Sequence, residues 1–449
     1  MSDSRALRIG RLAAAVTLAF AGVAQAESLQ DLYTAARAYD ATYLAARALA
    51  DTAEYKLTQA EALNRPNVGL GASVEGQNSW TPSGYSPVNP NKTLTSQVGV
   101  TGSMPVYNPA NSATIEQARR QLGIFSADLE SAEQDLIVRV AQAYFDVLAA
   151  QDSLSTAQAA KKAIAEQLAS AKRNFEVGTA TITDTREAQA RYDLSTAQEI
   201  AADNDLRTKK VVLDQIVGRR NVNPNPLIQP VALPALPSAE VEDWVAREDE
   251  HPVVRKARLG VDIAALEYKK ARATNGVTAS VSGSVGVQNT KNNLGAYGPA
   301  LSGEGTYKSG NLTLSINYPL YAGGALTARE KETAKLEEKA RDDLEYARRS
   351  VDQATRSAFL GVQSLTAQVK ALEAAESSSK LALEATQLGY KVGVRVNIDV
   401  LNAQTQLFTT QRDLAKARYD TLVTGLKLRQ ANGTLRPDDI AAINGLLVK

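Results

Sequence analysis

The sequence predicts a mixed α+β membrane protein, in which each chain adds four β-strands to a long α-helical coiled coil. Three observations lead to this prediction: an internal repeat, four short segments of alternating apolar residues, and two very long stretches with helical periodicity. The chain has no Cys, which excludes disulfides and thiolate metal sites. Its formal net charge of +1 gives no reason to expect nucleic acid as a partner.

The N-terminal segment predicts export. Three Arg residues precede an apolar run over about 12–24, and the run closes on Ala24-Gln25-Ala26, a small-x-small cleavage pattern. The alternative is a membrane anchor, but the apolar run is shorter than the roughly 20 residues needed to span a bilayer. We therefore expect a signal peptide over 1–26.

The mature chain is expected to be a tandem duplication. FEVGTATITD, which starts at Phe175, resembles YKVGVRVNID, which starts 215 positions later at Tyr390. Matching residues keep this spacing over the surrounding segments, which is the pattern of an internal repeat. We expect a first repeat over 27–218, a Pro-rich extended connector over 219–238, and a second repeat over 239–449.

Each repeat opens with a short helical region and then carries two strand-like segments. Apolar residues alternate with small or polar residues near 68–106 and again near 277–321, with polar loops over 78–95 and 288–310. This period of two over about ten residues is typical of transmembrane β-strands. A soluble β-hairpin with one buried face is the alternative that the pattern leaves open.

Each repeat then predicts a long helical hairpin, near 110–218 and near 324–433. Both stretches lack Pro and space their apolar residues three and four apart. A helix over 110–175 would be about 100 Å long, far longer than a globular core requires. One heptad frame describes the first stretch and implies left-handed supercoiling. Its two seam positions hold Val140, Val147, Leu154, Leu168 and Phe175, with Lys161 as the exception, and Ala143, Ala150, Ala157, Ile164 and Ala171.

Four strands cannot close a membrane barrel, because the smallest such barrels need eight. A dimer would supply eight strands and a trimer twelve. An eight-stranded barrel fills with its own side chains, so a water-filled pore favours a trimer or a larger assembly.

Enzyme activity, metals and cofactors are not expected. His251 is the only His, and without a second His or any Cys neither a His-based metal cluster nor a Cys nucleophile is available. The segment YAGGAL leads into a helix but lacks the Lys of a phosphate-binding loop. A periplasmic coiled-coil protein that bridges partners without a pore is the alternative function, and it leaves the four strands unexplained.

The centre of each helical hairpin predicts a turn. Gly178 and Gly393 lie among Val and Thr residues, and Gly accepts the positive φ that a helix end requires. We expect Asp184 to open the first return helix, with Glu187 completing a capping box. Asn397 is the expected N-cap of the second return helix, which would place Asp399 in its first turn.

Several segments, in the order of the duplication, resemble TolC-like outer-membrane efflux and secretion channels: FEVGTATITD, QARYD, YPLYAGG, YKVGVRVNIDVLNAQ and ARYDTLV. The resemblance covers essentially the whole mature chain. It implies a homotrimer with a twelve-stranded outer-membrane β-barrel and a periplasmic helical tunnel. Docking of a periplasmic adaptor (membrane fusion) protein and an inner-membrane transporter would open the tunnel. The lack of an N-terminal Cys fits the non-lipidated type I secretion branch.

The same resemblance assigns roles at the hairpin tips, which would form the periplasmic entrance. Asp399 matches the outermost residue of an entrance ring of carboxylates. At the position of the family's second ring carboxylate this chain has Asn402. The resemblance therefore implies weaker cation selectivity than in the family. Asp399 can stabilise the helix end and also belong to the ring. For Arg395 the alternative is an exposed, solvated charge at the tip without a gate role. The gate links implied between helices involve Tyr390, Arg395, Thr183, Asp184, Gln167 and Gln387.

Overall fold

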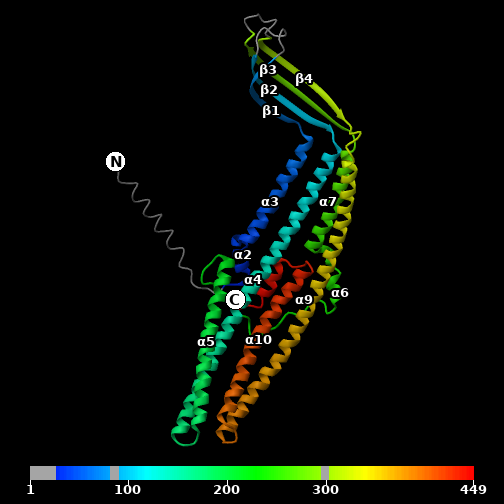
Figure 1. The fold of residues 1–449 in the computed structure, drawn as a ribbon. Coiled ribbons are helices and arrows are strands. Elements are labelled where there is room, and N and C mark those ends of the chain that lie inside the picture. The colour runs from blue at the N-terminus through cyan, green and yellow to red at the C-terminus, as the bar shows by residue number, and fades with distance from the viewer. Residues whose placement is uncertain (1–26, 81–89, 295–302, 449) are drawn as a thin grey trace, which may run out of the picture. The chain divides into compact units, whose positions relative to one another are not determined.

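The computed structural model describes residues 27–80, 90–294 and 303–448 (Figure 1). The signal peptide predicted over 1–26 lies outside these residues. In chain order the elements are α2 (Leu29–Tyr39), α3 (Ala41–Glu61), η1 (Ala62–Asn64), β1 (Asn67–Ser79), β2 (Asn91–Tyr107), α4 (Pro109–Glu176), α5 (Ile182–Val217), α6 (Val241–Val245), η2 (Glu248–Glu250), α7 (Pro252–Thr274), β3 (Thr278–Asn292), β4 (Gly305–Asn317), α9 (Ala325–Lys391), α10 (Asn397–Ala431) and α11 (Pro437–Asn444).

The described chain forms two compact units. The strand unit comprises Ala48–Ala127 and Arg255–Ala347, and the helical unit comprises the residues up to Arg47, Asp128–Val254 and the residues from Arg348 onward. Each unit therefore takes segments from both sequence repeats, so the compact units do not coincide with the repeats. None of the helices in the described part of the chain is long and apolar enough to cross a membrane.

The strand unit contains a four-stranded antiparallel sheet in the order β1-β2-β3-β4. Its register places Leu70 opposite Val100, and Val100 opposite Val285, on one face. The other face carries small or polar residues, such as Ser73 opposite Gln97. Because the same alternation runs through all four strands, the sheet has one apolar face and one polar face.

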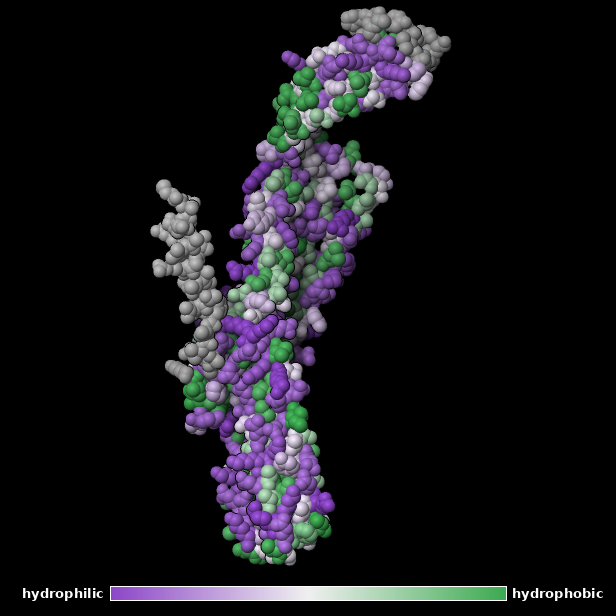
Figure 2. Space-filling model, turned by 90° about the vertical axis from the view of Figure 1, so that its left-hand side faces the viewer, coloured by the Kyte–Doolittle hydropathy of each residue, from purple (hydrophilic) through white to green (hydrophobic). Residues whose placement is uncertain are grey.

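The apolar face of the sheet is open to its surroundings. The side chains of Leu70 and Leu312 are 77% and 81% exposed. Figure 2 shows hydrophobic surface gathered over part of this sheet. Exposed apolar surface of this size marks a face that a membrane or a partner covers.

The strands are longer than the sequence pattern predicted. The loops expected over 78–95 and 288–310 begin later and end earlier, because β2 starts at Asn91, β3 continues to Asn292 and β4 starts at Gly305. These added residues are mostly Thr, Ser, Asn, Gln and Lys, which pair through their backbones as well as apolar residues do. Hydrophobic alternation alone could not find them.

The helical unit has its main core where the two long hairpins meet α2, α11 and the connector. Tyr144 and Phe145 of α4 are almost fully buried there, and the ring of Phe145 stacks on Tyr419 of α10 with centroids 5.7 Å apart. The hydroxyl of Tyr144 donates to the backbone oxygen of Asn225 at 2.8 Å, which fixes the extended connector against α4. Buried aromatic side chains thus join segments far apart in the sequence.

Most of the predicted heptad seam of α4 is buried. Phe175 is 43% exposed and is the clearest departure, because it lies at the hairpin tip. Lys161, the polar exception in the seam, pairs with Glu199 of α5 at 2.7 Å. The seam thus accommodates one charge by pairing it with the returning helix.

An ion pair between a buried carboxylate and a partly exposed guanidinium connects α2, α3 and α4. The guanidinium of Arg139 donates to both carboxylate oxygens of Asp40 at 2.9 and 3.0 Å, and Asp40 also accepts from the backbone N–H of Tyr43 at 2.8 Å. The bidentate bond from Arg139 holds the pKa of Asp40 below its usual value.

Replacing Arg139 by Met is expected to destabilise the protein by about 2 kcal/mol, because it leaves a buried carboxylate without its cation. Since the folded-state pKa of Asp40 is lowered, this contribution is complete above its unfolded pKa of about 3.9 and is lost as the pH falls through the folded value. Thermal unfolding in detergent should therefore give a lower melting temperature for the variant than for the wild type near pH 7, and this difference should become smaller below about pH 4.

The matched control is Arg207→Met, which removes an exposed pair with Asp203. We expect it to change stability by less than about 0.5 kcal/mol. Equal effects of the two substitutions at pH 7 would contradict a structural role for the Asp40–Arg139 pair.

Candidate functional site

The two hairpin tips of the helical unit have the same turn. Gly178 and Gly393 both have φ of +79°, as the sequence predicted. The N–H of Thr179 donates to the carbonyl of Asn174 at 2.8 Å, and the N–H of Val394 donates to the carbonyl of Gly389 at 2.9 Å. The tips lie side by side in Figure 1, at the turns from α4 to α5 and from α9 to α10. The duplicated sequence therefore builds duplicated left-handed helix ends.

The caps of both return helices differ from the sequence prediction. The N-cap of α5 is Thr181, which forms a capping box with Asp184, so the box predicted from Asp184 to Glu187 is wrong by one turn. The N-cap of α10 is Val396, without a side-chain bond, and Asn397 is the first residue of the helix. Asp399 lies in the first turn of α10, where the helix dipole favours a carboxylate.

Asn397 fails as a cap because its side chain joins the two hairpins instead. It is 2% exposed, accepts a hydrogen bond from the amide of Gln167 on α4, and donates to the backbone oxygen of Asp184 at 3.4 Å. A small apolar cluster surrounds this junction, formed by Ile164, Leu168, Ala171, Ala188 and Leu401. One buried amide therefore contacts α4, α5 and α10 at once.

Two further polar contacts cross between the hairpins. The amide of Asn174 on α4 donates to the hydroxyl oxygen of Tyr390 on α9 at 3.1 Å. The guanidinium of Arg191 on α5 donates to the amide oxygen of Asn402 on α10 at 3.0 Å. With the junction at Asn397, these contacts hold the tips of a single chain together.

Arg395 lies at the turn and reaches Asp399 of its own helix. Their closest side-chain atoms are 3.6 Å apart, and the side chains are 61% and 35% exposed. An exposed pair of this kind contributes little to stability. The stem of Arg395 packs over Gly389, where an added Cβ would lie 2.8 Å from the Cγ of Arg395. The backbone of α9 therefore helps to hold the cation at the tip.

The remaining predicted link residues occupy the same region. Thr183 is exposed on the first turn of α5, and Gln387 is half-buried on α9. Within the described residues of one chain, Tyr390 bonds to Asn174 and Arg395 pairs with Asp399, and no hydrogen bond or ion pair joins either of them to Thr183 or Asp184.

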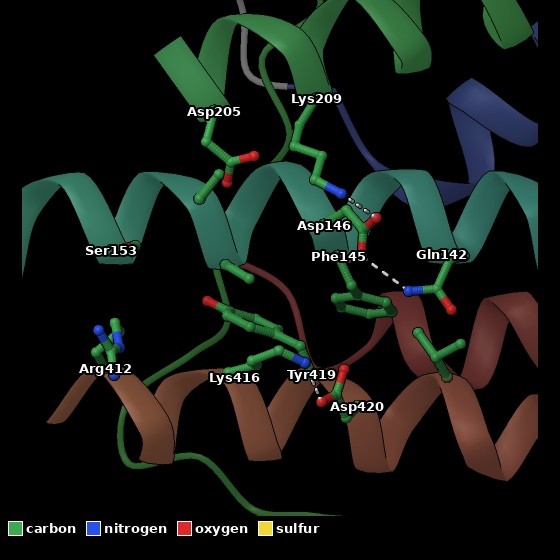
Figure 3. Close-up of a pocket in the computed structure, with 13 residues that line it drawn as sticks. Gln142, Phe145, Asp146, Ser153, Asp205, Lys209, Arg412, Lys416, Tyr419 and Asp420 are labelled. Atoms are coloured by element: carbon green, nitrogen blue, oxygen red, sulfur yellow. Dashed lines mark hydrogen bonds and ion pairs between the residues drawn. The ribbon is translucent and has the colours of Figure 1, made fainter. Parts of the chain in front are cut away.

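A cavity of about 340 Å³ lies above the tips, between α4, α5 and α10 (Figure 3). Lys209 pairs with Asp146 at 3.1 Å and Lys416 pairs with Asp420 at 2.7 Å, so both lysines on its walls are neutralised by carboxylates. Next to the cavity, the hydroxyl of Tyr419 donates to Asp152 at 2.7 Å.

Burial raises the pKa values of both groups in this last pair. The hydroxyl of Tyr419 therefore remains a donor at neutral pH. No group of three His, Cys, Asp or Glu side chains suited to a metal occurs among the described residues. The cavity thus serves as a polar junction between helices.

Comparison with known proteins agrees with the duplicated fold. The model of the outer membrane efflux protein family matches residues 32–219 and again 247–434, so its two matches begin 215 positions apart, the spacing of Phe175 and Tyr390. The chain belongs to the outer membrane efflux protein family.

Individual relatives place the chain within this family. It is 31% identical to outer membrane protein TolC of Escherichia coli, over 96% of this chain and 87% of that protein. It is also 31% identical to the alkaline protease secretion protein AprF of Pseudomonas aeruginosa, over 70% of this chain and 64% of that protein. The predicted TolC-like family and outer-membrane location are thereby confirmed, as is the coarse function of an efflux or secretion channel.

Solved structures share the fold. The outer membrane protein VceC of Vibrio cholerae has a TM-score of 0.75 at 19% identity, covering 90% of this chain and 96% of that chain. The MtrE outer membrane channel of Neisseria gonorrhoeae has a TM-score of 0.72 at 21% identity, covering 91% of this chain and 90% of that chain. The predicted fold class is confirmed.

The sequence did not predict two tip residues, Asn174 and Arg191, or the junction role of Asn397. The burial of Asn397 could have been predicted from helical periodicity. It precedes Val400 by three residues and Leu401 by four, which places it on the buried face of α10. Asn174 and Arg191 had no such signal, since their partners are more than 200 positions away.

Replacing Asn397 by Ala is expected to loosen the tips, because it removes both bonds of the buried amide and leaves Gln167 without its partner. The loss of about 2 kcal/mol corresponds to roughly 30-fold faster local opening. Hydrogen–deuterium exchange of peptides covering 160–170 and 395–405 should accelerate accordingly, while peptides from the main core should not change.

Asn402→Ala is the control, because Asn402 is exposed and bonds only to Arg191 among the described residues. Its exchange should accelerate much less than that of Asn397→Ala, because an exposed hydrogen bond contributes less than a buried one whose loss leaves a partner unsatisfied. If both variants exchange alike, Asn397 is not the residue that holds the hairpins together.

Proposed function

We propose that three copies of this chain form a closed outer-membrane channel, with the hairpin tips as its periplasmic entrance. A periplasmic adaptor and an inner-membrane transporter dock at the tips and open the entrance. Small molecules or secreted proteins then leave the cell through the channel. The observation that carries this proposal is the four-stranded sheet with one exposed apolar face and two unpaired edges.

The sheet edges support an assembly of several copies. Among the described residues, β1 pairs only with β2 and β4 pairs only with β3. A bilayer leaves no water to satisfy an open edge, so β1 of one copy must pair with β4 of the next. Three copies give twelve strands around a polar interior. A pore-free coiled-coil protein would have no use for such a sheet.

The tips support a gate that acts between copies. Within one chain the two hairpins are already joined through Asn397, Tyr390 and Asn402, so an entrance that opens must loosen contacts between neighbouring chains. The exposed Thr183 and the guanidinium of Arg395 are available for such contacts. Gln387 offers a further amide on α9.

The outer surface of the tips suits a docking partner. Val177, Val392 and Val394 are 73%, 65% and 76% exposed beside the two turns. Figure 2 shows hydrophobic surface at this end of the hairpins. Clustered apolar side chains on an otherwise polar surface mark protein contacts. Nothing in the tips supplies energy, so the transporter must do so.

Single-channel current in a planar bilayer tests the proposal. The wild type should insert and conduct, with a small conductance because its entrance is held closed. Arg395→Ser should conduct several-fold more without loss of thermal stability, since the exposed pair with Asp399 contributes less than about 0.5 kcal/mol. Asp399→Asn should reduce the preference for cations.

Arg341→Ser is a matched control, because it removes an exposed Arg from an i,i+4 pair in the strand unit, on α9. It should conduct like the wild type. Folded trimers that insert but carry no current, even with Arg395→Ser, would contradict the channel.

A further inference from the structure

Arg191 is a charged residue near the tips for which the sequence predicted no role. It lies on α5, nine residues after the N-terminal end of the helix, and its side chain is half-exposed. Its guanidinium donates to the amide oxygen of Asn402 at 3.0 Å. This contact holds a cation at the level of α10 where the entrance ring was predicted.

The partner of Arg191 leaves its charge intact. An amide oxygen accepts a hydrogen bond but carries no net charge, unlike a carboxylate. Among the described residues, no carboxylate forms an ion pair with Arg191. By contrast, Arg395 has a carboxylate partner, Asp399, 3.6 Å away.

Arg191 also lies close to the predicted ring carboxylate. Asp399 and Asn402 are three residues apart on α10, a spacing that puts their Cβ atoms about 5–6 Å apart on one helix face. A guanidinium bound to Asn402 is therefore near the Asp399 carboxylate, at a separation comparable to one Debye length of about 8–10 Å. Its positive potential acts on the same ions as the negative potential of Asp399.

We propose that Arg191 is a residue that determines ion selectivity at the entrance, where its unpaired charge opposes Asp399 and disfavours cations. This inference rests on the proposed function, since it requires that Asp399 and Asn402 face the ion path. Asn402 is the positioning residue, because its amide fixes the guanidinium without neutralising it. At the level of the predicted ring, each chain thus carries Asp399 with its partner Arg395, and Arg191 bound to Asn402.

The test is the reversal potential of single channels in a KCl gradient. Arg191→Gln should shift the reversal potential toward the equilibrium potential of K⁺, which corresponds to a cation-to-anion permeability ratio about two- to threefold higher. A unit charge about 7 Å from the ion path in water acts with opposite signs on cations and anions, so its removal alone would change the ratio about sevenfold. Screening over a Debye length of about 8–10 Å reduces this to two- to threefold. Asn402→Asp should shift it in the same direction, because the new carboxylate would neutralise Arg191.

Two control variants separate charge from structure. Arg191→Lys keeps the charge and should retain the wild-type reversal potential. Arg207→Gln makes the same substitution on the same helix, about 24 Å further along α5 and beyond the Debye length, and should also leave it unchanged. Heat-modifiable migration of each variant on gels checks that it assembles.

A reversal potential for Arg191→Gln equal to that of Arg207→Gln would overturn the inference. A shift caused equally by Arg191→Lys would also overturn it, since the cause would then be the bond geometry and not the charge. If the wild type itself inserts but carries no current, the proposed channel function fails, and this inference fails with it.

Discussion

The two unpaired edges of the four-stranded sheet are the constraint on which the rest of the structure depends. Every backbone N–H and C=O needs a partner, and a bilayer cannot provide one. Among the described residues of a single chain, the apolar side chains of the strands, such as Leu70 and Leu312, are exposed. The proposed assembly of three copies satisfies both requirements at once, because it closes the edges and turns the apolar face toward lipid.

The helical unit solves a related problem by duplication. One hairpin of two long helices has a narrow apolar seam and would leave much of it exposed. Two copies of the hairpin share a cluster around Leu168 and Leu401, and Asn397 joins them through a buried amide. The tips of one chain thus behave as a unit, and the proposed opening is assigned to contacts between chains.

The sequence predicted what is periodic or repeated and missed what depends on distant partners. Alternation located the strands, and the spacing of Phe175 and Tyr390 located both turns, since these signals are local. Polar strand ends were missed because backbone pairing does not require apolar residues. Asn397 was expected to cap a helix because Asn before a helix usually does. In the fold, however, tertiary packing buries Asn397 to 2% exposure. The contact between Arg191 and Asn402 likewise arises only once the chain has folded.

Disulfide trapping across the sheet edges would test the central claim most directly, because the natural chain has no Cys. One Cys at Ser73 in β1 is combined with a second at Ser309, Asn311 or Thr313 in β4. Three strand spacings, about 14 Å, separate these edges within one chain, too far for a disulfide. Oxidation of outer membranes should give covalent trimers for at least one pair and no larger species, with no trimers from single-Cys variants. Monomers throughout, or a ladder beyond the trimer, would contradict a closed barrel of three chains.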